Sequence, residues 1–179
     1  MGRWYYSFEV GIWNLFLAMN RATALIFPVK YERYWSYKKL FIYIILILAY
    51  PFIVDSYSFF DECRFKVYSS KCRQFRLTDQ WFAAVLTSVK AILAVGFTIF
   101  ALWKARKRGS MASSKIETRL TLQTLSASIL LIAFSLCELL AVLYYDPEDN
   151  DLYYLFNSLS DLLYSLYYYP VIVIMFVVW

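Results

Sequence analysis

Long apolar blocks alternate with short polar connections along the chain, and within the blocks the apolar residues follow neither a helical nor a strand period. Such blocks are typical of segments that are surrounded by lipid. About 20 apolar residues cross the roughly 30 Å hydrocarbon core of a bilayer. Five blocks approach that length, although the second is short: residues 4–27, 40–54, 81–103, 120–144 and 155–178. The pattern predicts an all-α membrane protein with five transmembrane helices in a single domain, residues 1–179.

The composition agrees with this prediction and argues against several functions. Hydrophobic residues make up 61% of the chain and charged residues 17%, whereas about a quarter of the residues are charged in soluble domains. The net charge of +5 comes from Lys and Arg in the connections rather than on one basic face, which favours membrane topology over nucleic-acid binding. The chain has no His, the usual general base and metal ligand. We therefore expect no enzyme activity, metal, cofactor or nucleic-acid partner.

The basic residues predict how the helices are oriented in the bilayer. Residues 28–39 and 104–119 together carry ten Lys and Arg residues, and short connections rich in these residues face the cytoplasm. The connection 146–151 is acidic, whereas the longer connection 55–80 contains five basic and four acidic residues. We expect the N-terminus outside and the C-terminus inside.

The sequence LAMNRATALIFPVKYERYW, residues 17–35, places a cation at the cytoplasmic end of the first block. Arg21 is tolerated there because its long side chain can reach water or a neighbouring helix. Pro28 then ends or redirects the helix, because proline has no backbone N–H and its ring crowds the preceding turn. Taken alone, Arg21 is explained as an interfacial anchor. With the helix ended at Pro28, Arg21 can instead be a positioned cation that faces the cytoplasm.

Five residues of this stretch match the D-R-Y-x-A-x-x-x-P-x-x-Y layout at the third helix of rhodopsin-like seven-helix receptors: Asn20, Arg21, Ala24, Pro28 and Tyr31. Asn replaces the acidic residue. NRATALIFPVKYERYW more specifically resembles the nematode serpentine chemoreceptors of class gamma, whose third helix ends in N-R-x-T-A-x-x-x-P-x-K-Y-E-x-x-W. The last block has YYYP where many receptors have Asn before the Pro. Sister nematode receptor classes are the alternative.

The resemblance implies that the chain corresponds to helices three to seven of a seven-helix receptor, so we expect a fragment that lacks the first two helices. It implies an external small-molecule ligand, a heterotrimeric G protein as partner, and the plasma membrane of sensory cells as location. Asn20, Arg21, Pro28 and Tyr31 would then form the G protein coupling site. A multi-span transporter or a membrane-embedded enzyme is the alternative, but the chain shows neither an internal repeat nor a nucleophile with a base.

Four ionisable residues lie within the apolar blocks, where charges are costly and often functional: Glu9, Lys90, Glu138 and Asp161. Counting about 1.5 Å per helical residue places all four in the outer half of the bilayer. They are candidates for a ligand cavity that opens outward. In the alternative interpretation, Lys90 pairs with one carboxylate to hold two helices together, and the other carboxyl groups are protonated or reach the lipid headgroups.

Cys63 and Cys72 lie in a connection expected outside, where the secretory route is oxidising. A disulfide between them would close a loop of about ten residues and contribute about 2 to 3 kcal/mol by the chain-entropy estimate. In many seven-helix receptors this connection is tied to a Cys of the third helix, which here would have to precede Met1. Free or alternately paired thiols are a further possibility. Cys137 lies in an apolar block and is expected to be inert.

Overall fold

The computed structural model describes residues 2–56, 60–64, 70–107, 115–146 and 150–178, and the side chains of residues 8–56, 60–63, 71–107, 121–146 and 150–168. Its long helices are α1 (Gly2–Ile26), α3 (Tyr37–Val54), α4 (Arg73–Lys107), α5 (Lys115–Leu143) and α6 (Asp151–Val178). Short helices lie between them: η1 (Pro28–Lys30), α2 (Tyr31–Tyr34), η3 (Glu62–Arg64) and η4 (Ser70–Cys72). The described part of the chain contains no strand. The predicted all-α class is confirmed.

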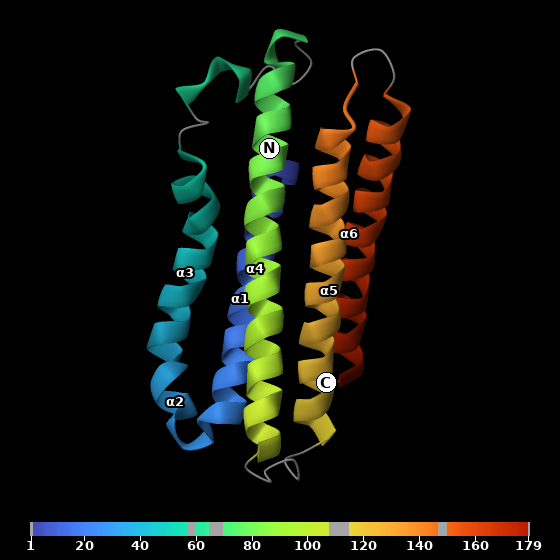
Figure 1. The fold of residues 1–179 in the computed structure, drawn as a ribbon. Coiled ribbons are helices and arrows are strands. Elements are labelled where there is room, and N and C mark those ends of the chain that lie inside the picture. Colours follow the sequence, from blue (N-terminus) through green and yellow to red (C-terminus); the bar gives the residue numbers. More distant parts are fainter. Residues whose placement is uncertain (1, 57–59, 65–69, 108–114, 147–149, 179) are drawn as a thin grey trace.

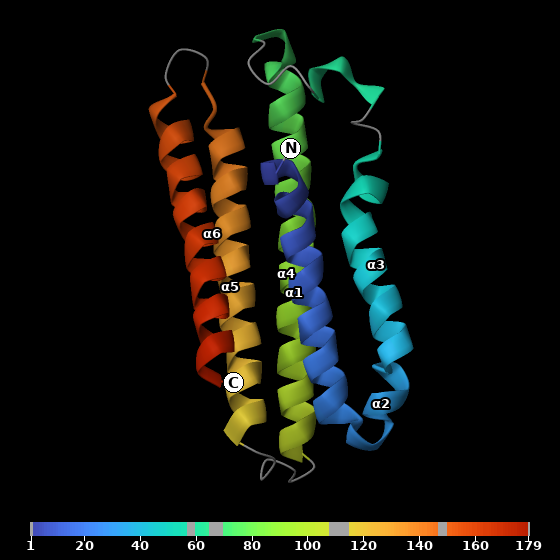
Figure 2. The ribbon, with the colours of Figure 1, turned by 180° about the vertical axis from the view of Figure 1, so that it is seen from behind.

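The long helices run up and down beside one another (Figure 1), and α1 lies against the face of α4 that is turned to the viewer in Figure 2. The turn with α2 lies at one end of the bundle, here called the α2 end. The connection with η3 and η4 lies at the opposite end, here called the disulfide end. The side chains of Tyr169 and Pro170, and the connection 108–114, lie outside the described residues.

Three helices are long and apolar enough to cross a membrane: Tyr37–Val54, Arg73–Lys107 and Thr121–Leu143. The described residues give up to four such spans if the bent pair Phe8–Ile26 and Pro28–Tyr34 counts as one. The helices also continue past several predicted blocks, since α4 runs from Arg73 to Lys107 rather than over 81–103. The apolar block measures the segment dissolved in lipid, whereas the backbone stays hydrogen-bonded as helix into the polar flanks.

α4 is the central helix of the bundle, because it packs against both α1 and α5, and α5 in turn packs against α6. One side of α4 carries small buried residues at alternating spacings of three and four: Ala84, Thr87, Ala91, Ala94, Thr98, Ala101 and Ala105. This spacing is the seam of a heptad repeat. Small side chains at such a seam let helix backbones approach closely in a membrane, where packing rather than water exclusion drives association.

α3 is the least buried of the helices that qualify as membrane spans, because only 11% of its most apolar window is covered by the rest of the molecule. Its exposed side chains are large and apolar, among them Phe41, Ile45 and Ile53. Aromatic contacts attach its first turns to α1 and to the residue after α2: the centre of the Tyr43 ring lies 5.6 Å from that of Phe16 and 5.3 Å from that of Trp35. Most of α3 therefore presents a surface suited to lipid.

Candidate functional site

The turn after α1 redirects the chain by 118° between Phe8–Ile26 and Pro28–Tyr34. The last regular backbone bond runs from the N–H of Phe27 to the carbonyl of Thr23, at 2.8 Å. Pro28 follows and has no N–H to continue the ladder. The N–H of Lys30 instead donates to the Phe27 carbonyl, at 3.0 Å, and starts a new turn. Pro28 therefore ends α1 and places α2 at the end of the bundle.

Side-chain hydrogen bonds fasten this turn onto the end of α1. The Tyr31 hydroxyl donates to Asn20 Oδ1 at 2.7 Å, and the Trp35 indole Nε1 donates to Thr23 Oγ1 at 2.6 Å. The Thr23 hydroxyl donates in turn to the Asn20 carbonyl at 2.8 Å. Four fixed positions of the motif thus form one polar cluster. Thr23 and Trp35 were not among the site residues predicted above, although both belong to the quoted pattern.

Arg21 stands apart from this cluster. Its side chain is half-buried at the α2 end, and the next residue in the chain, Ala22, is buried. In the described part of the chain Arg21 forms neither a hydrogen bond nor an ion pair, whereas the neighbouring Asn20 accepts the Tyr31 hydroxyl. An Arg carries five N–H donors in a fixed planar fork. The end of α1 beside the turn therefore holds a cation whose hydrogen-bonding capacity the described residues do not use.

Lys90 is buried between α1, α3 and α4, with 6% of its surface exposed. Its ammonium donates to the Phe8 carbonyl at 3.1 Å and lies 4.7 Å from the centre of the Tyr50 ring. Gly11 makes room for it, because a Cβ at that position would lie 3.0 Å from Lys90 Cε. A backbone carbonyl and an aromatic face thus receive the ammonium, and in the described residues no carboxylate forms an ion pair with it.

Glu138 belongs to a second polar cluster, which joins α4, α5 and α6. Gln80 donates to its Oε2, and the Ser160 hydroxyl donates to its Oε1 at 2.5 Å. Gln80 also donates to Asn157 Oδ1 at 3.2 Å, and Asn157 in turn donates to the Tyr153 carbonyl at 3.0 Å. Both carboxyl oxygens of a buried acid are therefore satisfied by neutral donors from two other helices.

The four predicted ionisable residues lie at different positions in the bundle. Lys90 and Gln80, the α4 member of the Glu138 cluster, are ten residues apart on the same helix, which is about 15 Å along its axis. Glu9 is half-buried and follows Phe8, whose carbonyl binds Lys90, whereas Asp161 is exposed on α6. Lys90 and Glu9 thus lie near one helix contact, and Glu138 at another.

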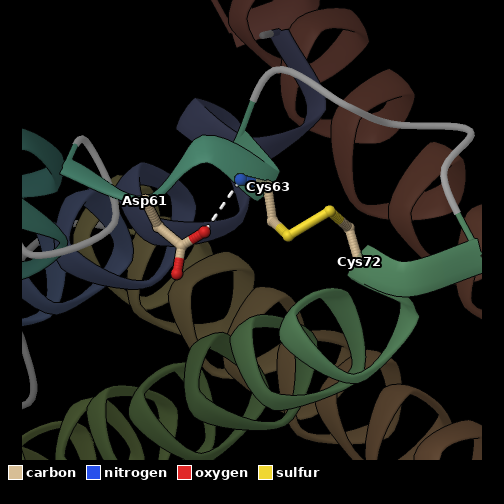
Figure 3. The surroundings of a disulfide bond; sticks show 3 residues. All are labelled: Asp61, Cys63 and Cys72. Carbon is tan, nitrogen blue, oxygen red and sulfur yellow. Dashed lines mark hydrogen bonds between the residues drawn. A yellow bond between two sulfur atoms is a disulfide. The ribbon is translucent and has the colours of Figure 1, made fainter.

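At the disulfide end, Cys63 and Cys72 are joined by a disulfide with an S–S distance of 2.10 Å (Figure 3). The Cys63 N–H also donates to Asp61 Oδ1 at 2.8 Å, which fixes the short turn before the bond. Cys72 is buried against the start of α4, and Cys137 is a free, buried thiol. The disulfide therefore ties the connection after α3 to the first turn of α4.

A family model described as Srg family chemoreceptor matches residues 3–177. The chain belongs to the Srg chemoreceptor family. Curated proteins and solved structures give no match. The family is one of receptors rather than enzymes, and with the apolar helices it makes this chain an integral membrane protein of the serpentine chemoreceptor kind. A lipid bilayer and a small-molecule ligand fit such a receptor.

In this Srg-family receptor, the site residues missed by the sequence analysis are of two kinds. Thr23 and Trp35 lie within a motif, so that their shared spacing was visible in the sequence. Gln80, Asn157 and Ser160 carry no motif, and they become a cluster only because three helices bring them to Glu138. Their one signal in the sequence is polarity within or beside an apolar block.

Proposed function

We propose that this Srg-family protein is a class gamma chemoreceptor, which binds an external small molecule and signals to a heterotrimeric G protein at its α2 end. The proposal rests on the unused hydrogen-bond donors of Arg21. The Asn20–Tyr31 and Thr23–Trp35 bonds fix the turn around it, while Arg21 itself makes no hydrogen bond or ion pair among the described residues. A helix end that is held by the turn and presents a cation with unused donors is suited to a partner's carbonyl or carboxyl groups.

The proposed orientation puts the α2 end in the cytoplasm of a sensory cell and the disulfide end outside. Two observations support it. The basic residues of 28–39 and 104–107 lie at the α2 end, as the positive-inside rule requires. The Cys63–Cys72 disulfide lies at the opposite end, and disulfides persist on the oxidising side of a membrane. We further propose that the long helices act as helices three to seven of a receptor bundle.

For the external ligand we retain Glu9 and Lys90 as candidate contacts. Lys90 is a buried cation whose partners are a carbonyl and an aromatic ring, so a polar ligand could compete for its donors. We assign Glu138 a different role, because Gln80 and Ser160 already bind both of its oxygens. Its cluster joins three helices and would respond to their rearrangement, which is the general mode of receptor switching.

The coupling proposal is tested without knowledge of the ligand. The chain is reconstituted in lipid vesicles, and the rate at which a panel of purified heterotrimeric G proteins binds a hydrolysis-resistant GTP analogue is measured. Arg21→Ala should lower the stimulated rate by about 10- to 100-fold, because charge-assisted hydrogen bonds contribute roughly 1.5 to 3 kcal/mol. Arg106→Ala is the matched control, since Arg106 is an exposed Arg at the same end.

The two variants separate coupling from anchoring. Both should insert in the same amount as the unchanged chain, because an Arg at a helix end contributes little to insertion. Arg21→Ala and Arg106→Ala vesicles that stimulate nucleotide binding equally would contradict the proposed role of Arg21. A loss of insertion that parallels the loss of stimulation would show that Arg21 is an anchor.

A further inference from the structure

At the α2 end, basic and aromatic side chains gather around Phe27, the residue that links α1 to η1. Lys104 Nζ, from the last turns of α4, lies 5.5 Å from the centre of the Phe27 ring and 5.6 Å from that of Phe100. The Tyr34 ring lies 6.4 Å from Phe27. The backbone N–H of Lys30 donates to the Phe27 carbonyl, and the side chains of Lys30 and Arg33 are exposed in the same turn. We call this surface the α2 corner: Phe27, Val29, Lys30, Arg33, Tyr34 and Lys104.

The apolar members of the α2 corner are exposed to a degree that water alone would disfavour. Val29 is 96% exposed at the tip of the turn, and Phe27 and Tyr34 are 42% and 44% exposed. Tyr37, just beyond the corner, is 88% exposed. Such side chains are favourable where they border the acyl chains and headgroups of a bilayer, a level at which aromatic residues are enriched. The exposed side chains of the corner therefore suit the depth of a lipid headgroup.

The charge of this surface is strongly positive. Residues 27–39 and 100–107, all of them described, carry seven Lys and Arg residues and one acid, Glu32. Lys39 Nζ donates to the Arg33 carbonyl at 2.7 Å, which adds its charge beside the corner. Lys107 Nζ lies 5.6 Å from the Trp103 ring. Long Lys side chains near a helix end can keep their ammonium groups at the polar boundary of the membrane.

We propose that the α2 corner binds the phosphate-bearing headgroup of an anionic phospholipid in the adjoining leaflet. Lys30 and Arg33, both exposed in the turn, and Lys104 of α4 would supply the positive charge. The interleaved Val29, Phe27 and Tyr34 border the lipid chains, an arrangement that fits a lipid better than an acidic protein surface in water. The inference requires only that the chain lies in a bilayer, and it does not rest on the proposed coupling through Arg21.

Electron paramagnetic resonance tests this binding on the whole chain in phosphatidylcholine membranes. Spin-labelled phosphatidylserine and spin-labelled phosphatidylcholine are added separately, and the motionally restricted fraction gives their relative association constant. One basic residue near the surface corresponds to about a fivefold preference for an anionic lipid, so we expect at least about that preference for phosphatidylserine. The triple variant K30Q/R33Q/K104Q should lower that preference by about twofold or more, while Lys38, Lys39, Arg106 and Lys107 keep their charges.

The matched control is K71Q/R73Q/R76Q, which removes three positive charges at the disulfide end. It should keep the preference, and so should the charge-conserving variant K30R/K104R. Dye labelling of the buried Cys137 thiol checks that every variant is folded. Equal restricted fractions for both lipids in the unchanged chain would overturn the proposal and leave the corner to an acidic protein partner. An equal loss in both triple variants would also overturn it, because general charge attraction would then suffice.

Discussion

Replacing Gly11 by Ala tests whether the position of the Lys90 side chain depends on the absence of a side chain at residue 11. An added Cβ at Gly11 would lie 3.0 Å from Lys90 Cε, 3.3 Å from Nζ and 3.4 Å from Cδ. Non-bonded carbon atoms prefer about 3.5 to 4.0 Å. The end of the Lys90 side chain must therefore shift by a few tenths of an ångström, and we expect this shift to weaken or break its 3.1 Å bond to the Phe8 carbonyl.

The size of the effect follows from two opposing terms. Loss of a hydrogen bond to a charged group costs about 1.5 to 3 kcal/mol. Ala in place of Gly inside a helix returns up to about 1 kcal/mol. Gly96 is the matched control, because a Cβ there meets nothing within 4 Å. G11A should therefore be less stable than G96A by about 1.5 to 3 kcal/mol, or roughly 3 to 12 °C in the midpoint of thermal unfolding.

Cys137 supplies the assay. It is buried and is not part of the disulfide, so a thiol-reactive fluorescent dye reports unfolding of purified chain as the temperature rises. A third variant isolates the cause: in a Lys90→Ala background the crowding atoms are gone, and G11A should be no more destabilising than G96A. If G11A is as stable as G96A while Lys90 is present, the proposed effect of the close contact between Lys90 and Gly11 is refuted.

Two further predictions concern the Glu138 cluster and the disulfide. Ser160→Ala removes a donor to the buried Glu138 and should lower the free energy of unfolding by about 1 to 3 kcal/mol. The control is Ser165→Ala, because the Ser165 hydroxyl only bonds the carbonyl one turn back on α6, and it should lower that free energy by less than about 0.5 kcal/mol. Equal unfolding midpoints of the two variants in the dye assay would argue against the cluster. Non-reducing peptide mapping should link Cys63 to Cys72, and reduction should cost about 2 to 3 kcal/mol; alkylation of both thiols without reduction would contradict the pairing.

The class of the fold was predictable because it depends on solvent rather than on contacts. A backbone in hydrocarbon must satisfy its own hydrogen bonds, so apolar blocks such as 81–103 become helices whatever they later touch. The end of α1 at Ile26 could also be predicted from nearby residues, because Pro28 cannot continue a helix. Helix lengths were less predictable: the eight residues 73–80 are polar enough to fall outside the apolar block, yet they extend α4 as helix.

The sequence by itself determined the membrane environment, the turn at Pro28 and the family motif around Arg21, because each depends on residues that are close together in the chain. Only the tertiary structure decided the partners of the ionisable residues. Depth along a helix can be counted from the sequence, but the direction of a side chain around the helix axis depends on which helices pack there. Lys90 therefore faces Phe8 and Tyr50, while Glu138 faces Gln80 and Ser160, and neither set of partners could be read from depth along the helix alone.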